Sequence, residues 1–223
     1  MKIPLWKKWW SYVTPVVLEM TGSEQNPELA VLLNRGRLQL LSGNAIYSWD
    51  DLYRNFMIAF ERLNIRDRKI EDVMLLGLGL GSVPFMLERK FDRLYYYTAV
   101  EWDETVAELA SRYTLSRLES PVNVVVADAE LFVEICEETF DLLIVDIFED
   151  DLTPPQFETL DFLRACDALL NPGGMLLFNR LHGDHKDKVA AERFLERKFQ
   201  VAFPEAWSID TGGNLILCYE KKG

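Results

Sequence analysis

The strongest constraint on the fold is a short apolar run that leads directly into a glycine-rich turn. Residues 73–76 are all apolar, and the turn that follows is Gly77-Leu78-Gly79-Leu80-Gly81-Ser82. A continuous apolar run is typical of a buried parallel strand, and glycines allow a tight turn in which backbone N–H groups approach a ligand closely. The order of strand, glycine turn and helix therefore predicts a nucleotide-binding unit of an α/β sheet.

Acidic residues end three further apolar runs. Glu101, Asp128 and Asp146 each stand at or just after the end of one such run. The carboxyl ends of parallel strands meet at one edge of a sheet, which is where ligands bind in open α/β folds. Glu101 follows the glycine turn by about twenty residues, the spacing at which an acid accepts hydrogen bonds from ribose hydroxyls.

The rest of the chain predicts a β-rich beginning followed by alternating helices and strands. Strands are expected at residues 12–20, 29–34, 37–41, 95–100, 121–126, 140–145, 175–178 and 214–219, with a turn at 171–174. Helices are expected at residues 48–64, 82–90, 104–113, 129–137, 155–170 and 186–199. Such alternation gives a parallel sheet with helices on both faces. We predict a small N-terminal β-strand and hairpin domain at residues 1–47 and a Rossmann-like nucleoside-binding domain at residues 48–223.

Composition and charge favour a cytoplasmic enzyme. The 223 residues are 49% hydrophobic, enough to bury a core, and no apolar run approaches the roughly 18 residues that span a bilayer. The net charge of −12 argues against nucleic acid as a partner, because phosphate contacts need clustered Lys and Arg. The three cysteines lack CxxC spacing, so no metal site is predicted. Trp6, Trp9 and Trp10 are expected to pack against another subunit or the domain's own flank rather than lie on a membrane.

Three motifs together carry a resemblance to a known family. The turn at residues 77–82 is similar to a GGGDGG turn, Val100-Glu101-Trp102-Asp103 to an EID segment, and residues 146–155 to a DSSDP loop. Residues 50–57 are also similar to a DE-x-x-YHEM helix. From about Tyr12 to Tyr219, the chain resembles the spermidine synthase-like (polyamine aminopropyltransferase-like) family of the class I S-adenosylmethionine-dependent methyltransferase superfamily. The resemblance implies a mostly parallel seven-stranded sheet preceded by a small N-terminal β-domain, and a homodimer.

The resemblance also implies residues that bind S-adenosylmethionine or its decarboxylated form. These cofactor-binding residues are Gly77, Gly79, Gly81, Glu101, Asp128, Ala129 and Asp146. Glu101 would hold the ribose hydroxyls and Asp128 the adenine amino group. Asp146 would be the catalytic residue, because a carboxylate beside the attacking amine can accept its proton.

The acceptor side departs from the family pattern. Tyr53, Arg54 and Glu149 are the predicted acceptor-binding residues, but the Tyr, His and Glu of YHEM fall on Arg54, Asn55 and Phe56. The family's acid inside the glycine turn, which anchors the cofactor's ammonium group, is replaced by Leu80. An arginine facing the acceptor pocket would repel a polycation.

Three functions follow from these matches and departures. The first is methyl transfer to a small-molecule acceptor, amines included, which Arg54, Phe56 and Leu80 favour. The second is a polyamine aminopropyltransferase that uses decarboxylated S-adenosylmethionine and grips a diamine with Asp146, Glu149 and Asp150. The third is a catalytically inactive nucleoside-binding or assembly protein. An NAD-dependent Rossmann enzyme is less favoured, because Asp128 and the Asp146-x-x-Glu149 segment do not belong to its pattern.

Overall fold

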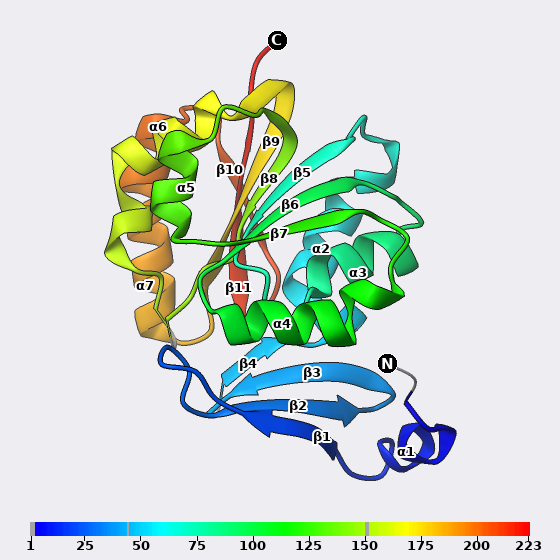
Figure 1. Cartoon of the computed structure of the whole chain (residues 1–223). Coiled ribbons are helices and arrows are strands. Elements are labelled where there is room, and N and C mark those ends of the chain that lie inside the picture. The colour runs from blue at the N-terminus through cyan, green and yellow to red at the C-terminus, as the bar shows by residue number, and fades with distance from the viewer. Residues whose placement is uncertain (1–2, 44, 150–151) are drawn as a thin grey trace.

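Two β-sheets organise the part of the chain that the computed structural model describes, residues 3–43, 45–149 and 152–223. The smaller sheet is antiparallel with the order β1-β2-β3-β4, and the larger one has the order β10-β11-β9-β8-β5-β6-β7. The smaller sheet lies beneath the larger one in Figure 1. The chain thus has an α/β fold with a separate N-terminal sheet, as the sequence predicts.

The N-terminal sheet is built from short strands joined by tight turns. Its strands are β1 (Val16–Thr21), β2 (Leu29–Asn34), β3 (Arg37–Ser42) and β4 (Ala45–Ser48). Between β2 and β3, Arg35 and Gly36 both have positive φ angles, 52° and 74°, as two-residue hairpins of the favoured twist require. The predicted domain boundary at residues 47 and 48 falls within one residue of the end of β4, and the division into two domains stays a prediction.

The large sheet is mostly parallel, and this prediction is confirmed. Its strands are β5 (Asp72–Leu76), β6 (Tyr96–Glu101), β7 (Val122–Val126), β8 (Phe140–Val145), β9 (Leu170–Leu181), β10 (Trp207–Asp210) and β11 (Asn214–Glu220). Strands β5 to β9 run parallel, whereas β11 pairs antiparallel with both β9 and β10. Strand order reverses on either side of β5, and such a switch point places a ligand crevice at the carboxyl ends of the strands.

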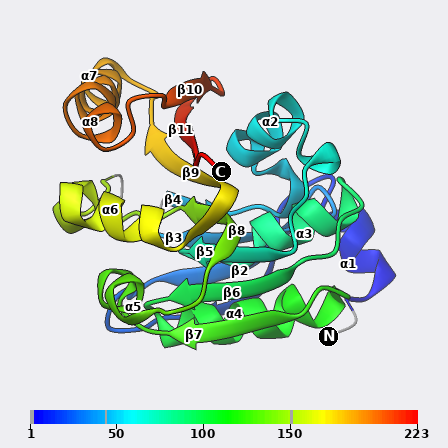
Figure 2. The same ribbon diagram turned by 90° about the horizontal axis from the view of Figure 1, so that it is seen from above.

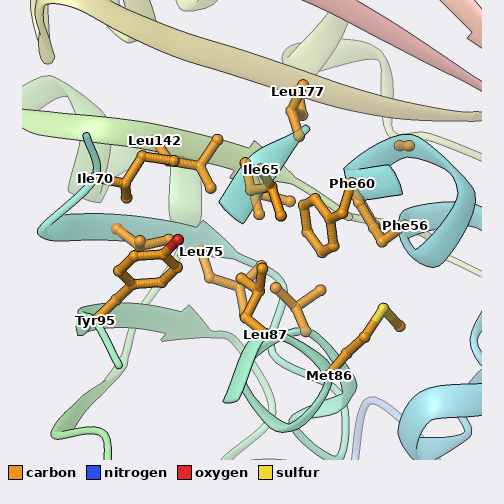
Figure 3. Packing of buried hydrophobic residues seen from close by; sticks show 14 of the residues in the cluster. Phe56, Phe60, Ile65, Ile70, Leu75, Met86, Leu87, Tyr95, Leu142 and Leu177 are labelled. Atoms are coloured by element: carbon orange, nitrogen blue, oxygen red, sulfur yellow. The ribbon is translucent and has the colours of Figure 1, made fainter. Parts of the chain in front are cut away.

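Helices cover both faces of the large sheet (Figures 1 and 2). One face carries α2 (Arg54–Arg62), α3 (Ser82–Arg89) and α4 (Glu104–Tyr113); the other carries α5 (Ala129–Ile135), α6 (Leu160–Ala168) and α7 (His185–Phe194). The short α1 (Leu5–Trp10) and α8 (Gln200–Ala202) complete the α-helices of the described residues. Figure 3 shows Phe56 and Phe60 of α2 against Met86 and Leu87 of α3, below Leu177 of β9. Phe56 is therefore a core residue.

A third apolar cluster joins the two sheets. It contains Leu29, Val31, Leu33, Leu38 and Leu40 of the N-terminal sheet, Leu80 of the glycine turn, and Val106, Leu109 and Tyr113 of α4. Leu80 is only 2% exposed. The side chain that replaces the family's acid therefore points into the packing between the sheets.

Several predicted boundaries are wrong for identifiable reasons. The helix predicted at residues 48–64 is broken, because Tyr53 has a non-helical ψ of 82° that separates a 3-10 turn, Asp50–Leu52, from α2. The turn predicted at residues 171–174 lies inside β9, where Gly173 N–H donates to the carbonyl of Lys221. Strands β4 and β10 were not predicted, because their residues, Ala-Ile-Tyr-Ser and Trp-Ser-Ile-Asp, form no continuous apolar run.

The N-terminal tryptophans are exposed in the structure. Trp6, Trp9 and Trp10 are 65%, 77% and 57% exposed, so they do not pack against the domain's own flank. None of the helices in the described part of the chain has the length and apolar character that crossing a bilayer requires. The homodimer and the cytoplasmic location stay predictions.

The position of Leu80 predicts a large loss of stability on truncation. Leu80→Ala removes buried side-chain atoms between the two sheets, and such changes cost about 2–5 kcal/mol. Urea unfolding followed by circular dichroism would measure the loss. Leu94→Ala is the control, since Leu94 is 58% exposed and surface changes stay within about 0.5 kcal/mol. Equal losses for the two variants would contradict the packing role of Leu80 between the two sheets.

Candidate functional site

A cavity of about 770 Å³ opens at the carboxyl edge of the large sheet. Its walls include Gly77 after β5, Glu101 at the end of β6, Asp128 after β7 and Asp146 after β8. The N-terminal sheet and its loops close the other side through Gln25, Asn26, Pro27, Ser42, Ala45, Ile46 and Tyr47. The size is that of a typical small-molecule site. The three strand-end acids that the sequence singles out thus line one cavity.

The glycine turn brings two strands into close backbone contact. Gly77 has a φ of 89°, and a Cβ atom there would lie 2.3 Å from the carbonyl oxygen of Asp146. The Asp146 N–H donates to the Leu76 carbonyl at 2.8 Å. Gly77 and Gly79 line the cavity, whereas Gly81 does not; a Cβ atom at Gly81 would meet Leu115 instead. Gly81 therefore serves the start of α3, and the structure does not bring it to the site.

Glu101 is fixed by backbone donors of the glycine turn. Its Oε2 accepts from the N–H groups of Leu78 and Gly79, both at 3.1 Å, and its Oε1 accepts from the Asp103 N–H at 3.2 Å. Burial raises the pKa of the Glu101 carboxyl, and these three hydrogen bonds oppose the rise. The carboxylate is therefore held rigidly in the cavity wall, with lone pairs left for a ligand.

Asp103 ties the N-terminal sheet to the same wall. It caps α4 by accepting from Thr105 and Val106 N–H groups through Oδ1. Its Oδ2 accepts from the Ser23 hydroxyl and the Asn26 amide. Sequence reasoning missed Asp103, although an aspartate directly before a helix that begins with Glu104 is a typical N-cap signal.

Asp128 and Ala129 stand at the start of α5. Asp128 caps this helix by accepting from the Leu131 N–H at 3.0 Å, and both residues line the cavity. Only Oδ1 of Asp128 is used by the cap. Its second oxygen can accept from a ligand, and Trp102, which is 52% exposed, lines the same cavity.

Asp146 is held by two donors that share one of its oxygens. Oδ1 accepts from Asn179 Nδ2 at 2.7 Å and from the Tyr53 hydroxyl at 3.3 Å. No described residue donates to Oδ2. Burial raises the pKa of the Asp146 carboxyl to about 6, while the bonds from Asn179 and Tyr53 act against the rise. Near neutral pH this carboxylate can accept a proton from a bound group.

Asn179 is itself held by a second amide. Its Oδ1 accepts from Asn214 Nδ2 at 3.0 Å, and its Nδ2 faces Asp146, so both ends of the amide are engaged. Asn179 is fully buried in β9, and Asn214 begins the antiparallel partner strand β11. Sequence reasoning missed both residues. Asn179 directly follows the apolar run 175–178, the same pattern that singles out Asp146.

Two of the three predicted acceptor-binding residues line the cavity, and the third does not. Tyr53 lines the cavity, and the pKa of its hydroxyl lies well above the ordinary value because of burial and the neighbouring Asp146 charge. Glu149 lines the exposed rim, and Asp150 lies outside the described residues. Arg54 is exposed and is not among the described lining residues, so the predicted repulsion of a polycation by Arg54 loses its basis. Successive helical residues point about 100° apart, which turns Asn55 to the cavity instead.

The cavity is strongly acidic. Its carboxylates are Glu101, Asp103, Asp128, Asp146 and Glu149, and the described lining residues include no Lys, Arg or His. A site lined by one sign of charge favours ligands of the opposite sign. Within residues 3–43, 45–149 and 152–223, no group of three or more His, Cys, Asp or Glu side chains is placed to hold a metal ion.

Sequence comparison relates the chain to two kinds of transferase. It is 28% identical over 114 residues to the polyamine aminopropyltransferase of Vibrio vulnificus (strain CMCP6), covering 50% of this chain and 38% of that protein. It is 30% identical over 138 residues to the eEF1A lysine and N-terminal methyltransferase homolog of Drosophila pseudoobscura pseudoobscura, covering 58% of this chain and 20% of that protein. No protein-family model matches the chain. The chain therefore aligns with well under half of the length of these relatives.

Structural comparison relates the chain to the same two groups. Spermidine synthase from Thermotoga maritima has a TM-score of 0.70 with 16% identity, covering 92% of this chain and 73% of that chain. Human methyltransferase-like protein 13, in complex with SAH, has a TM-score of 0.58 with 22% identity, covering 77% of this chain and 78% of that chain. At these identities the likeness concerns the fold.

Together, the matches confirm the fold class and the family resemblance. In sequence the chain is similar to polyamine aminopropyltransferases, and its fold is the class I methyltransferase fold. The matched relatives are named as aminopropyltransferases and methyltransferases. The enzyme class expected from the sequence, an S-adenosylmethionine-dependent transferase, agrees with them.

The raised pKa of Asp146 predicts a specific pH dependence of stability. In the folded chain this carboxyl keeps its proton up to about pH 6, whereas the unfolded value is 3.8. As pH rises from about 3.8 to about 6, the free energy of unfolding of the wild type should therefore fall relative to that of Asp146→Asn. Above about pH 6, the difference between the two free energies should be constant. Urea unfolding at a series of pH values would measure the difference. Asp161→Asn, on the exposed side of α6, is the control. A difference that stays flat from pH 4 to pH 7 would contradict the raised pKa.

The Asn214–Asn179 pair predicts a remote effect on Asp146. A carboxylate at position 214 can only accept hydrogen bonds, so Asn214→Asp should turn the Asn179 amide and present its oxygen to Asp146. The pKa of the Asp146 carboxyl should then rise further. A ¹³C NMR titration of the carboxyl carbon would measure it. Asn123→Asp adds the same charge at an exposed site on β7 and should leave the pKa of the Asp146 carboxyl unchanged. Equal pKa values in the two variants would show that Asn214 does not act on Asp146 through Asn179.

Proposed function

We propose that the protein is an S-adenosylmethionine-dependent transferase that methylates a small-molecule amine. The observation that carries this proposal is the placement of Asp146 in the cavity wall. One oxygen is held by Asn179 and Tyr53, and the other is left for a ligand. A fixed carboxylate that titrates near neutrality suits a group that must take a proton from an attacking amine.

The cofactor would lie along the carboxyl ends of β5, β6 and β7. Gly77 and Gly79 leave room for close approach to the backbone, and Glu101 offers remaining lone pairs to a pair of ribose hydroxyls. Asp128 offers its second oxygen to the adenine amino group. The donor set and the cavity volume thus fit a nucleoside. When bound, the cofactor would supply a methyl group on a sulfonium, which is a good leaving group.

The chain would then have two tasks. It must hold a neutral amine in line with the methyl carbon and keep water away, which lowers the barrier by positioning. As the nitrogen–carbon bond forms and the sulfur–carbon bond breaks, the amine nitrogen becomes cationic. Asp146 stabilises this charge and accepts the proton through its free oxygen. Asn179 and Tyr53 keep the carboxylate aimed at the acceptor.

Methyl transfer is supported over aminopropyl transfer by two buried side chains. Leu80, where the family has an acid for the cofactor's ammonium, belongs to the cluster between the sheets. Phe56, where the family has the glutamate of YHEM, is fully buried in the core. Neither position presents a carboxylate to the cavity, so two groups that the family uses for aminopropyl transfer are absent from these places.

The charge of the cavity favours aminopropyl transfer as the second candidate. Five acidic residues and no basic residue stand among the described lining residues. Decarboxylated S-adenosylmethionine lacks the carboxylate of its parent, so an acidic wall attracts it more strongly. The polyamine aminopropyltransferase of Vibrio vulnificus supports this candidate as well.

Calorimetric titration distinguishes these candidates from a non-catalytic protein. We expect the purified chain to bind S-adenosylmethionine more tightly than its decarboxylated form, methylthioadenosine or NAD. Asp146→Asn should retain this binding and lose about 10²- to 10⁴-fold in turnover. Asp161→Asn is again the control and should keep both the binding of S-adenosylmethionine and the turnover. Preference for the decarboxylated form would overturn methyl transfer in favour of the second candidate, and no binding of any of the four would remove the nucleoside site altogether.

A further inference from the structure

We infer that Asn55, together with Tyr53 and Asp146, forms an acceptor subsite for a monoamine that carries an uncharged polar group. The inference rests on the proposed function and names the class of acceptor. Such an acceptor has an amine at one end and a hydroxyl or carboxamide at the other. A diamine, with a second ammonium group, is the class that this subsite excludes.

The first observation is an unpartnered amide in the cavity wall. Asn55 is only 6% exposed and lines the cavity, yet neither its Nδ2 nor its Oδ1 makes a hydrogen bond with a described residue. Buried amide groups nearly always have partners, because leaving one unpaired is costly. A ligand that pairs both atoms of Asn55 would remove that cost.

The second observation is that this amide lines the same cavity as the proposed reaction centre. Burial raises the pKa of the Tyr53 hydroxyl, and Asn55, two residues further along the chain, acts against that rise. The Tyr53 hydroxyl in turn lies 3.3 Å from Asp146 Oδ1. All three side chains line the same cavity. An acceptor whose amine is held by Asp146 can therefore reach Asn55 with a polar group a few bonds away.

The hydrogen-bonding groups of the Asn55 amide favour an acceptor whose second polar group is uncharged. An amide offers one acceptor and two donors, which a hydroxyl or carboxamide can match on both sides. An ammonium group could use only the oxygen; it would leave the Asn55 NH₂ unpaired and would lose its own hydration without a carboxylate beside it. The residue that follows Asn55, at the family's glutamate position, is the buried Phe56. Of the other carboxylates that line the cavity, Glu149 lies at the exposed rim, and Glu101, Asp103 and Asp128 belong to the wall proposed for the nucleoside.

The remaining wall favours an apolar body between the two polar ends. Ile46, Ile147, Phe148, Phe157 and Leu181 line the cavity along with Tyr53 and Asp146. Apolar walls with a few placed polar groups are typical of sites that bind small organic molecules. An alkyl chain of a few carbons would lie against them.

The test compares three acceptors with the same four-carbon chain, 4-amino-1-butanol, 1,4-diaminobutane and butylamine. Binding to the protein saturated with S-adenosylhomocysteine is measured by calorimetry, and methyl transfer by mass spectrometry. We expect the amino alcohol to bind roughly tenfold more tightly than the other two, since a site that hydrogen-bonds a hydroxyl discriminates against analogues that lack it.

Two variants test the role of Asn55 itself. Asn55→Asp keeps the shape and adds a charge, and it should reverse the preference so that the diamine binds best. Asn55→Leu removes the amide, and this variant should bind the amino alcohol and butylamine with equal affinity. Asn123→Asp, exposed on β7, is the matched charge control and should keep the wild-type order.

The outcomes separate this inference from the proposed function. If S-adenosylhomocysteine does not bind, both the inference and the proposed function fail. If it binds, but wild type prefers the diamine, treats the three acceptors alike or binds none of them, the inference is overturned while the nucleoside site stands. The inference is also overturned if Asn55→Asp folds, binds S-adenosylhomocysteine and keeps the wild-type order.

Discussion

The contact between the glycine turn and the end of β8 determines the geometry of the whole site. Gly77 lies so close to the Asp146 carbonyl that a Cβ atom would come within 2.3 Å of it, and Asp146 N–H bonds to Leu76. This contact places the cofactor turn and the proposed proton acceptor side by side. Glu101 strengthens the arrangement, because it accepts from the backbone of the same turn. Any larger residue at position 77 would push the two strand ends apart.

A second constraint is the packing of the N-terminal sheet against the glycine turn and α4. Leu80 contributes to that packing, and Asp103 accepts hydrogen bonds from Ser23 and Asn26 across the same junction. The N-terminal sheet therefore forms one wall of the cavity and helps to fix its shape. Holding Asp146 partly buried with a raised pKa costs stability at neutral pH, a cost that is common where function needs a perturbed group.

The sequence predicted the parts of the site that depend on local pattern. Glu101, Asp128 and Asp146 were found because each follows an apolar run, and parallel strands end at one edge. Asn179 and Asn214 were missed, because their pairing depends on the antiparallel register of β9 and β11. The orientation of Arg54 and Asn55 could not be predicted from the sequence either, since it follows from the non-helical backbone conformation of Tyr53. Long-range pairing and local kinks carry no simple periodic signal.

We expect the acidic cavity to bind an adenosyl nucleoside with its sulfur toward Asp146. A crystal structure of the protein with S-adenosylhomocysteine tests this most directly. The ribose hydroxyls should lie within hydrogen-bond distance of Glu101, the adenine amino group near Asp128, and the sulfur opposite the free oxygen of Asp146. A nucleoside bound elsewhere on the chain, or bound in this cavity with its sulfur directed away from Asp146, would rule out the proposed role of Asp146.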